Sequence, residues 1–203
     1  MNSGFNTSSE KKIGVTIFAS GKGTNAENLI RYFDQHPIIK INLIVCNNPQ
    51  AGVCKVAEKH EIPIKFLLQK AEETAEEFIA FLRKYDTDYI LLAGYLKLLD
   101  PLLVKAFRHR ILNIHPALLP KYGGRGMYGR YVHEKVIENK EKETGITIHE
   151  VNELYDQGAI VFQKSIPVFR EDTVETIEQK VRQMEFEFFP GVIEKYILEK
   201  EKR

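Results

Sequence analysis

The stretch Leu112–Pro120 reads LNIHPALLP, and both the fold and the candidate site can be predicted by working outward from it. Ile111 and Ile114 are apolar and β-branched, which favours a buried strand. Pro116 ends this strand abruptly, because proline has no N–H to donate to a strand ladder. We therefore expect a buried strand whose carboxyl end opens directly into a loop.

Two polar side chains mark the end of this strand. Alternate residues of a strand point to the same side, so Asn113 and His115 share one face. In an open parallel α/β sheet, ligands bind just beyond the carboxyl ends of the strands. An amide there can donate to an oxyanion, and an imidazole can move a proton. The pattern fits a catalytic pair, and it fits equally an Asn and a His that cap the strand through local hydrogen bonds.

Four strand-and-helix units precede this stretch. Short apolar runs predict strands, and patterns with one apolar face predict the helices between them. The strands are expected at Ile13–Ala19, Ile41–Cys46, Ile64–Leu68 and Tyr89–Ala93. Helices are expected through Leu29, Ile30 and Phe33, at about Ala51–His60, at Ala71–Lys84, and after Asp100-Pro101. Consecutive βα units form a doubly wound parallel sheet, in which the central stretch supplies the fifth strand.

The pattern changes after the central stretch. A helix is predicted at about Tyr131–Asn139, and strands at Ile146–Val151 and Ala159–Val168 form an antiparallel extension of the sheet. A long helix is expected over Thr173–Leu198, and the charged tail Glu199–Arg203 is expected to fray. The predicted fold is thus α/β, with a Rossmann-like doubly wound, mostly parallel sheet and an antiparallel C-terminal extension. We expect it to be a single domain over residues 1–203.

A glycine-rich turn, SGKGTN at Ser20–Asn25, links the first predicted strand to a helix. Free amides at a helix start can hold a phosphate, so this turn is a candidate anion site. It is not a P-loop, because the long spacing before a Gly-Lys-Ser/Thr is missing, and its third glycine does not fit a dinucleotide fingerprint. The alternative is a tight βα turn with Thr24 as the N-cap.

Composition limits the class of protein. Of the 203 residues, 43% are hydrophobic and 28% charged, as in an ordinary soluble domain. Lys and Arg number 29 against 28 Asp and Glu, which argues against a large nucleic-acid footprint. Two cysteines predict neither a disulfide framework nor a metal cluster. No apolar run approaches about 18 residues, and the polar start Met1–Lys12 lacks a signal-peptide core, so we expect a cytoplasmic protein without membrane contact.

Five segments carry a family resemblance: Ser20–Asn25, LAGYLKLL at Leu92–Leu99, NIHPALLP at Asn113–Pro120, GITIH at Gly145–His149, and DQG at Asp156–Gly158. In this order they resemble the small bacterial phosphoribosylglycinamide formyltransferases, or glycinamide ribonucleotide transformylases. These are folate-dependent enzymes of purine synthesis. The last three segments together are the most specific, and the resemblance implies the formyltransferase fold over nearly the whole chain.

The resemblance implies a catalytic trio of Asn113, His115 and Asp156. In the implied reaction, the amine of glycinamide ribonucleotide attacks the formyl carbon of 10-formyltetrahydrofolate, and no metal is needed. Asn113 would donate to the oxyanion, His115 would stabilise it or move a proton, and Asp156 would hold His115 and accept the amine's proton. Without the resemblance, Asp156 reads as a loop-capping residue. Thr147 and His149 alternate onto one strand face and resemble residues that support the trio.

The resemblance also implies binding residues. Gly23, Thr24 and Asn25 would hold the ribonucleotide phosphate, and Glu185 on the last helix would bind the ribose. The folate would contact two loops and the central strand, through Leu96, Lys97, Leu98, Leu99, Asn113, Asn152, Glu153, Leu154 and Tyr155. Small molecules are the expected partners, without nucleic acid, and we expect a monomer or weak homodimer.

The chain departs from the family pattern in three places. Lys97 stands where better-known members carry Arg, which gives up bidentate geometry. The region aligned with another folate-facing Arg offers only Lys70. The glycine-rich loop over residues 123–132 is longer than in those members, with Arg125 and Arg130 as candidate anion contacts.

A sugar-nucleotide formyltransferase remains possible from the sequence, although such enzymes usually run longer, and two further functions also remain open. A formyltetrahydrofolate deformylase-like hydrolase would share the Asn-His-Asp arrangement and use water in place of the amine. A non-catalytic nucleotide-binding module would use the anion site without needing all three of Asn113, His115 and Asp156. Turnover of formyl-folate separates these classes.

Overall fold

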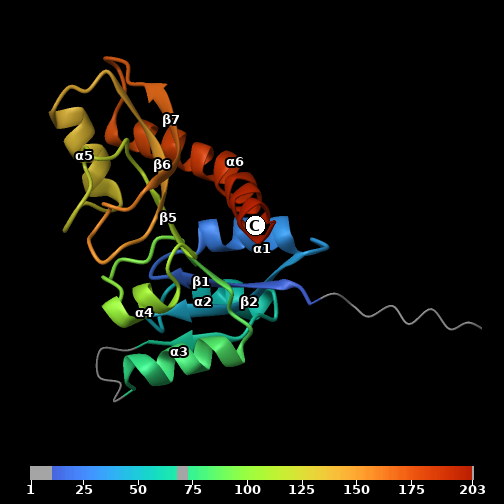
Figure 1. Cartoon of the computed structure of the whole chain (residues 1–203). Helices are drawn as coiled ribbons and strands as arrows, with labels where there is room; N and C mark the ends of the chain where they lie inside the picture. Colours follow the sequence, from blue (N-terminus) through green and yellow to red (C-terminus); the bar gives the residue numbers. More distant parts are fainter. Residues whose placement is uncertain (1–10, 68–72, 203) are drawn as a thin grey trace, which may run out of the picture.

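A computed structural model describes residues 11–67 and 73–202 of the chain. Its N-terminal part alternates strands and helices: β1 (Ile13–Ala19), α1 (Thr24–Phe33), β2 (Ile39–Cys46), α2 (Val53–Lys59), β3 (Ile64–Phe66), α3 (Ala75–Lys84), β4 (Tyr89–Leu92), α4 (Pro101–Ala106) and β5 (Ile111–His115). The remaining elements are α5 (Arg130–Glu138), β6 (Glu143–Glu150), β7 (Ile160–Pro167) and α6 (Val174–Glu201). Figure 1 shows these elements along the chain.

The strands of the described residues form one sheet in the order β3-β2-β1-β4-β5-β6-β7. The first five strands pair in parallel, and β6 and β7 add to them antiparallel. The doubly wound sheet and its antiparallel extension are therefore confirmed. The chain order reverses between β1 and β4, which are neighbours, and ligands of such sheets bind beyond the carboxyl ends at this reversal.

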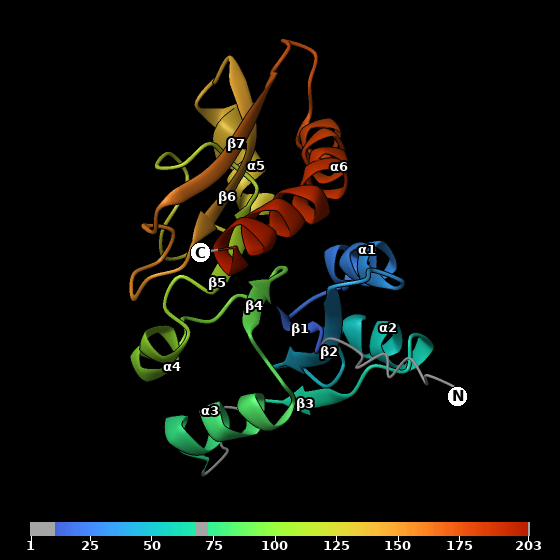
Figure 2. The same ribbon diagram turned by 45° about the vertical axis from the view of Figure 1, so that its right-hand side comes forward.

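Helices cover both faces of the sheet, so most strand residues are buried whichever way they point. One core lies under α1, α2 and α6 and includes Val15, Leu91 and Ile114. The other lies under α3 and α4 and includes Phe18 and Ile90. Figure 2 shows α1 and α2 on one side of β1–β3 and α3 on the other. Burial on both faces explains why these strands read as continuous apolar runs.

The structure corrects the predictions for the starts of α3 and α1. We expected α3 to begin at Ala71, but its first helical residue is Ala75, because Thr74 and Glu77 form a capping box there. The expected starting point at Ala71, like the candidate Lys70, lies outside the described residues. The N-cap of α1 is Gly23, so the interpretation of Thr24 as the N-cap is wrong.

The C-terminal tail also differs from the prediction. We expected fraying from Glu199, yet α6 continues to Glu201. Glu201 accepts a hydrogen bond from the Tyr89 hydroxyl at 2.8 Å and pairs with Arg110 at 3.2 Å. These contacts with β4 and the start of β5 hold the last turn against the sheet. The helix contains Pro190, and Figure 2 shows that it changes direction along its length, as expected for an internal proline.

Candidate active site

A cavity of about 610 Å³ lies beyond the carboxyl ends of β1, β4 and β5. Its wall combines the turns after β1 and β4, the end of β5, the glycine-rich loop before α5, the β6–β7 loop and one face of α6. This is the reversal point of the sheet, where the fold predicts a ligand. The volume lies within the usual range of small-molecule sites, about 300–1,000 Å³.

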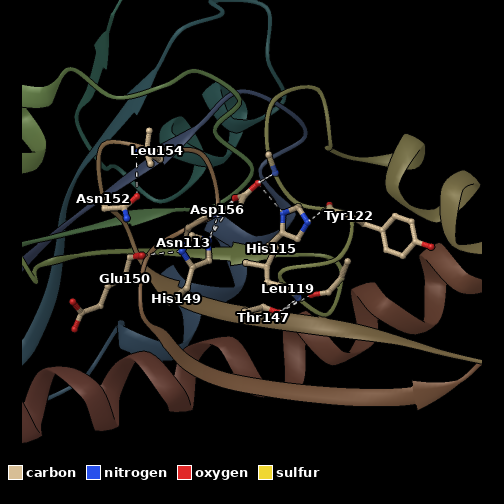
Figure 3. Close-up of polar contacts among 12 residues, drawn as sticks. Asn113, His115, Leu119, Tyr122, Thr147, His149, Glu150, Asn152, Leu154 and Asp156 are labelled. Atoms are coloured by element: carbon tan, nitrogen blue, oxygen red, sulfur yellow. Dashed lines mark hydrogen bonds and ion pairs between the residues drawn. The ribbon is translucent and has the colours of Figure 1, made fainter. Parts of the chain in front are cut away.

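All three residues of the expected trio line this cavity, and Figure 3 shows their side chains close together. Asn113 and His115 lie on β5, and Asp156 reaches them from the β6–β7 loop. The Asn113 amide nitrogen is 3.5 Å from Oδ1 of Asp156, and Nδ1 of His115 is 3.7 Å from Oδ2. The structure thus brings Asp156, which only the family resemblance related to this site, beside the pair of Asn113 and His115 that strand alternation had predicted.

His149 and Thr147 support this trio from β6. Antiparallel pairing places His149 opposite Asn113 and Thr147 opposite His115. Nδ1–H of His149 donates to the Glu150 carbonyl at 2.8 Å, and Nε2 lies 3.1 Å from the Asn113 amide nitrogen and 3.5 Å from Oδ1 of Asp156. The Thr147 hydroxyl donates to the Ala117 carbonyl at 2.6 Å and so holds the loop after β5. His149 therefore contacts the trio directly, whereas Thr147 acts on the backbone beside it.

The environment of the trio sets its charges. Burial lowers the pKa of His115 below its ordinary value, despite the opposing effect of the Asp156 carboxylate. Burial also acts to raise the pKa of Asp156, but its contacts with His149, His115 and the Gly124 N–H outweigh that effect and lower it. Near neutral pH the pair is therefore a neutral imidazole beside a carboxylate. A neutral His115 can accept a proton, and Asp156 can stabilise the imidazolium that results.

The turn after β1 supplies another part of the cavity wall. Thr24 and Asn25 line it, whereas Gly23 is buried beneath them. Gly23 has φ +80°, and a Cβ there would lie 2.7 Å from Cα of Val53 on α2. The left-handed backbone and the close packing against α2 are thus enough to require glycine at this position, whether or not a ligand binds. Phosphate binding by the Gly23 amide stays a prediction.

Glu185 joins this turn across the fold. The Asn25 amide donates to its carboxylate at 2.9 Å, although the two residues are far apart in sequence. Burial raises the pKa of Glu185 to about 7, against the lowering effect of the Asn25 hydrogen bond. Oδ1 of Asn25 and Nδ1 of His133 are buried, and neither has a hydrogen-bond partner in the part of the chain that the structure describes. Buried polar atoms without partners at a cavity wall indicate a bound ligand or water.

Two residues of α6 were missed by our sequence reasoning. Glu178 and Arg182 line the cavity beside Glu185. They lie seven and three positions before it, which is one helix face. This periodicity was a usable signal. Hereafter, the β5 end of the cavity means Asn113, His115 and Asp156 together with His149 behind them on β6, and the α6 end means Asn25, His133, Glu178, Arg182 and Glu185.

The residues expected to bind folate do not all face this cavity. Leu96, Lys97 and Tyr155 line it together with Asn113. The side chain of Leu99 is buried in the core under α3 and α4, while Leu98 and Leu154 are exposed. Asn152 and Glu153 line a second cavity of about 460 Å³ beside α4. Contacts of Leu98, Leu99, Asn152, Glu153 and Leu154 with a folate stay predictions.

The two arginines of the glycine-rich loop have different surroundings. Arg125 lies on the cavity wall, between Gly124 and Gly126. Arg130 is paired with Glu134 at 3.0 Å and also with Glu175. Gly124, Gly126 and Gly129 all have positive φ, which lets the loop turn tightly along the wall. Of the two expected anion contacts, only Arg125 is placed to serve the cavity.

Within residues 11–67 and 73–202, no group of three or more His, Cys, Asp or Glu side chains is arranged to hold a metal ion. None of the helices in that part of the chain is long and apolar enough to cross a membrane.

Comparisons with known proteins agree with this geometry. The sequence profile of the formyl transferase family matches residues 13–193. A Haemophilus influenzae protein named phosphoribosylglycinamide formyltransferase is 38% identical over 188 residues, covering 90% of this chain and 85% of that protein. The crystal structure of phosphoribosylglycinamide formyltransferase from Bacillus halodurans has a TM-score of 0.80 at 37% identity, covering 90% of this chain and 94% of that one.

Plant proteins are also similar over the same region. A chloroplastic phosphoribosylglycinamide formyltransferase of Arabidopsis thaliana is 38% identical over 185 residues, covering 88% of this chain. The chain spans 63% of the length of that protein and 59% of its counterpart in Vigna unguiculata.

Proposed function

Because the chain belongs to the formyl transferase family, we propose that it transfers the formyl group of 10-formyltetrahydrofolate to the amine of glycinamide ribonucleotide. The products are formylglycinamide ribonucleotide and tetrahydrofolate, a step of purine biosynthesis. The observation that carries this proposal is the convergence of Asn113, His115 and Asp156 in a cavity that also contains a helix N-terminus. One end supplies acyl-transfer chemistry and the other can hold an anion.

The β5 end performs the chemistry. The substrate amine attacks the formyl carbon, a C–N bond forms, and the tetrahedral intermediate carries an oxyanion. The Asn113 amide donates to this oxyanion, a contact worth roughly 10²–10³ in rate. His115 takes up the amine proton at Nδ1, and the Asp156 carboxylate stabilises the imidazolium. Cleavage of the bond to folate N10, with return of the proton to that nitrogen, releases tetrahydrofolate.

The α6 end binds the ribonucleotide. The amides at the start of α1, at Gly23, Thr24 and Asn25, hold its phosphate, since the first amides of a helix have no acceptor within it. Glu185 accepts hydrogen bonds from ribose hydroxyls and remains linked to Asn25. The partnerless Oδ1 of Asn25 supports this placement, because a hydroxyl or amide of the substrate would satisfy it.

The folate co-substrate enters from the β4 side of the cavity. Leu96 and Lys97 follow β4 directly, and Tyr155 precedes the catalytic Asp156. Their position on the same cavity wall as Asn113 supports a folate bound beside Asn113, with its formyl carbon between the trio and the amine. Lys97 contributes one positive charge to the wall, without the bidentate geometry of an arginine.

The test distinguishes a transferase from a hydrolase and from a binding module. The enzyme is incubated with 10-formyltetrahydrofolate, with and without glycinamide ribonucleotide, and tetrahydrofolate release is followed by absorbance. We expect release to depend on the ribonucleotide, with one tetrahydrofolate per formylated product, because water is not oriented for attack. Rapid tetrahydrofolate release that does not depend on the ribonucleotide would mean that the protein is a hydrolase. No release in either tube would mean a binding module.

A further inference from the structure

The backbone of the turn Tyr122–Gly124 holds both proton-handling members of the trio. The Tyr122 carbonyl accepts from Nε2–H of His115 at 2.7 Å, and the Gly124 N–H donates to Oδ2 of Asp156 at 2.9 Å. Figure 3 shows Tyr122 beside His115 on the side away from Asp156. A single short turn thus fixes the imidazole from one side and the carboxylate from the other.

This turn is not a conformation that the backbone adopts on its own. Tyr122 has φ +57°, in the left-handed region that large side chains rarely occupy. Its phenol is held by two residues that follow α5: it donates to Glu141 at 2.8 Å and accepts from the Asn139 amide at 2.9 Å. Glu141 also pairs with Lys121 at 3.0 Å. The phenol is therefore the anchor that keeps the Tyr122 carbonyl in place.

The carbonyl decides which ring nitrogen of His115 carries the proton. A carbonyl oxygen only accepts, so a contact at 2.7 Å requires hydrogen on Nε2. The lone pair of the neutral ring is then on Nδ1, the nitrogen that faces Asp156. In the other tautomer, Nδ1–H would donate to Asp156 and could take up no proton. Besides Asp156, the titratable groups around His115 are His149 on β6 and His133 on α5, and neither contacts Nε2.

We propose that Tyr122 is a positioning residue of the reaction: its phenol, anchored by Glu141 and Asn139, holds its carbonyl on Nε2 of His115 and so keeps Nδ1 free to accept the proton. The inference rests on the proposed function for its kinetic consequences. The tautomer itself is a property of the free protein.

Steady-state kinetics and NMR of the His115 ring in Tyr122→Phe test the proposal. We expect kcat to fall about tenfold with the KM of both substrates within twofold, because binding groups are untouched. Nitrogen NMR shifts of the His115 ring should show Nε2–H in the wild type and a mixture of tautomers in the variant. The apparent pKa of His115 should also move down, since the Tyr122 carbonyl stabilises the protonated ring.

Matched variants separate positioning from general loop stability. Glu141→Leu removes the acceptor and should reproduce Tyr122→Phe, whereas Glu141→Gln keeps an acceptor for the phenol and should restore most of kcat. Lys121→Met removes the other partner of Glu141 and should leave kcat unchanged. A Tyr122→Phe protein with wild-type kcat and tautomer, even if less stable, would overturn the proposal. If the wild type has no transferase activity, the proposed function fails, but the NMR comparison still decides the tautomer.

Discussion

The two ends of the cavity differ in how completely the protein pairs their polar atoms. At the β5 end, each ring nitrogen of His115 and His149 faces a specific partner, at 2.7 to 3.7 Å. At the α6 end, the described residues leave Oδ1 of Asn25 and Nδ1 of His133 unpaired, and Glu185 is desolvated. Paired groups are held in place before the substrate arrives, which favours chemistry. Unpaired groups gain most from a ligand, which favours binding.

Removing the charge of Asp156 at the β5 end is expected to have the largest effect. Asp156→Asn keeps the shape but cannot stabilise a protonated His115. We expect kcat to fall by roughly 10²–10³, with the KM of both substrates within a few-fold, because the interaction acts mainly in the transition state. Steady-state kinetics would measure it. Asp34→Asn, on an exposed residue after α1, is the matched control and should leave kcat unchanged. A folded Asp156→Asn protein with normal kcat would show that Asp156 only caps its loop.

The β5 end shows what the sequence could and could not predict. Strand alternation placed Asn113 and His115 on one face, since a period of two follows from strand geometry alone. Asp156 has φ +54° in an irregular loop, so no local periodicity placed it, and only the family resemblance did. The carbonyl of Tyr122 and the N–H of Gly124 were missed for a different reason. Every residue has these groups, so side-chain identity cannot reveal which of them reaches the site.

At the α6 end the limits were different. Helical spacing could have identified Glu178 and Arg182, because a helix face is set by its period. The contact between Asn25 and Glu185 depends on how α6 packs against α1, which is a tertiary property.

The start of α3 was misplaced for a local reason: the apolar pattern extends before the capping box at Thr74, and the cap decided the boundary.

A second test uses the desolvation of Glu185. Its pKa in the folded protein is about 7, against a reference value of 4.5, so the folded state holds this proton more tightly. The stability from that proton is fully present below about pH 4.5 and is lost as the pH rises to 7. Relative to Glu185→Gln, which cannot titrate, the wild type should therefore lose stability over this range. The loss should be on the order of 3 kcal/mol, at about 1.4 kcal/mol per pKa unit.

Urea denaturation at several pH values would measure this difference. Glu187→Gln changes an exposed carboxylate on the same helix and should keep the wild-type dependence on pH. Identical pH dependence in wild type and Glu185→Gln would mean that the carboxyl is well solvated, and the contrast between the two ends would weaken.

The smallest effect is expected from the glycine-rich loop before α5. Arg125 lines the cavity, and no ion pair involves it among the described residues, whereas Arg130 is paired with Glu134 and Glu175. We expect Arg125→Ala to raise the KM of the ribonucleotide about tenfold, or about 1.4 kcal/mol, through loss of a charge-assisted contact with its phosphate. The kcat value should not change, because the contact exists in ground and transition states alike. Arg130→Ala is the matched control and should change the same KM by less than twofold.

Since Arg125 is exposed, its contribution to ribonucleotide binding should shrink at high salt, where charges are screened over shorter distances. Kinetics of both variants at two ionic strengths would measure this, and equal effects of the two substitutions would show that the loop acts only through its net charge.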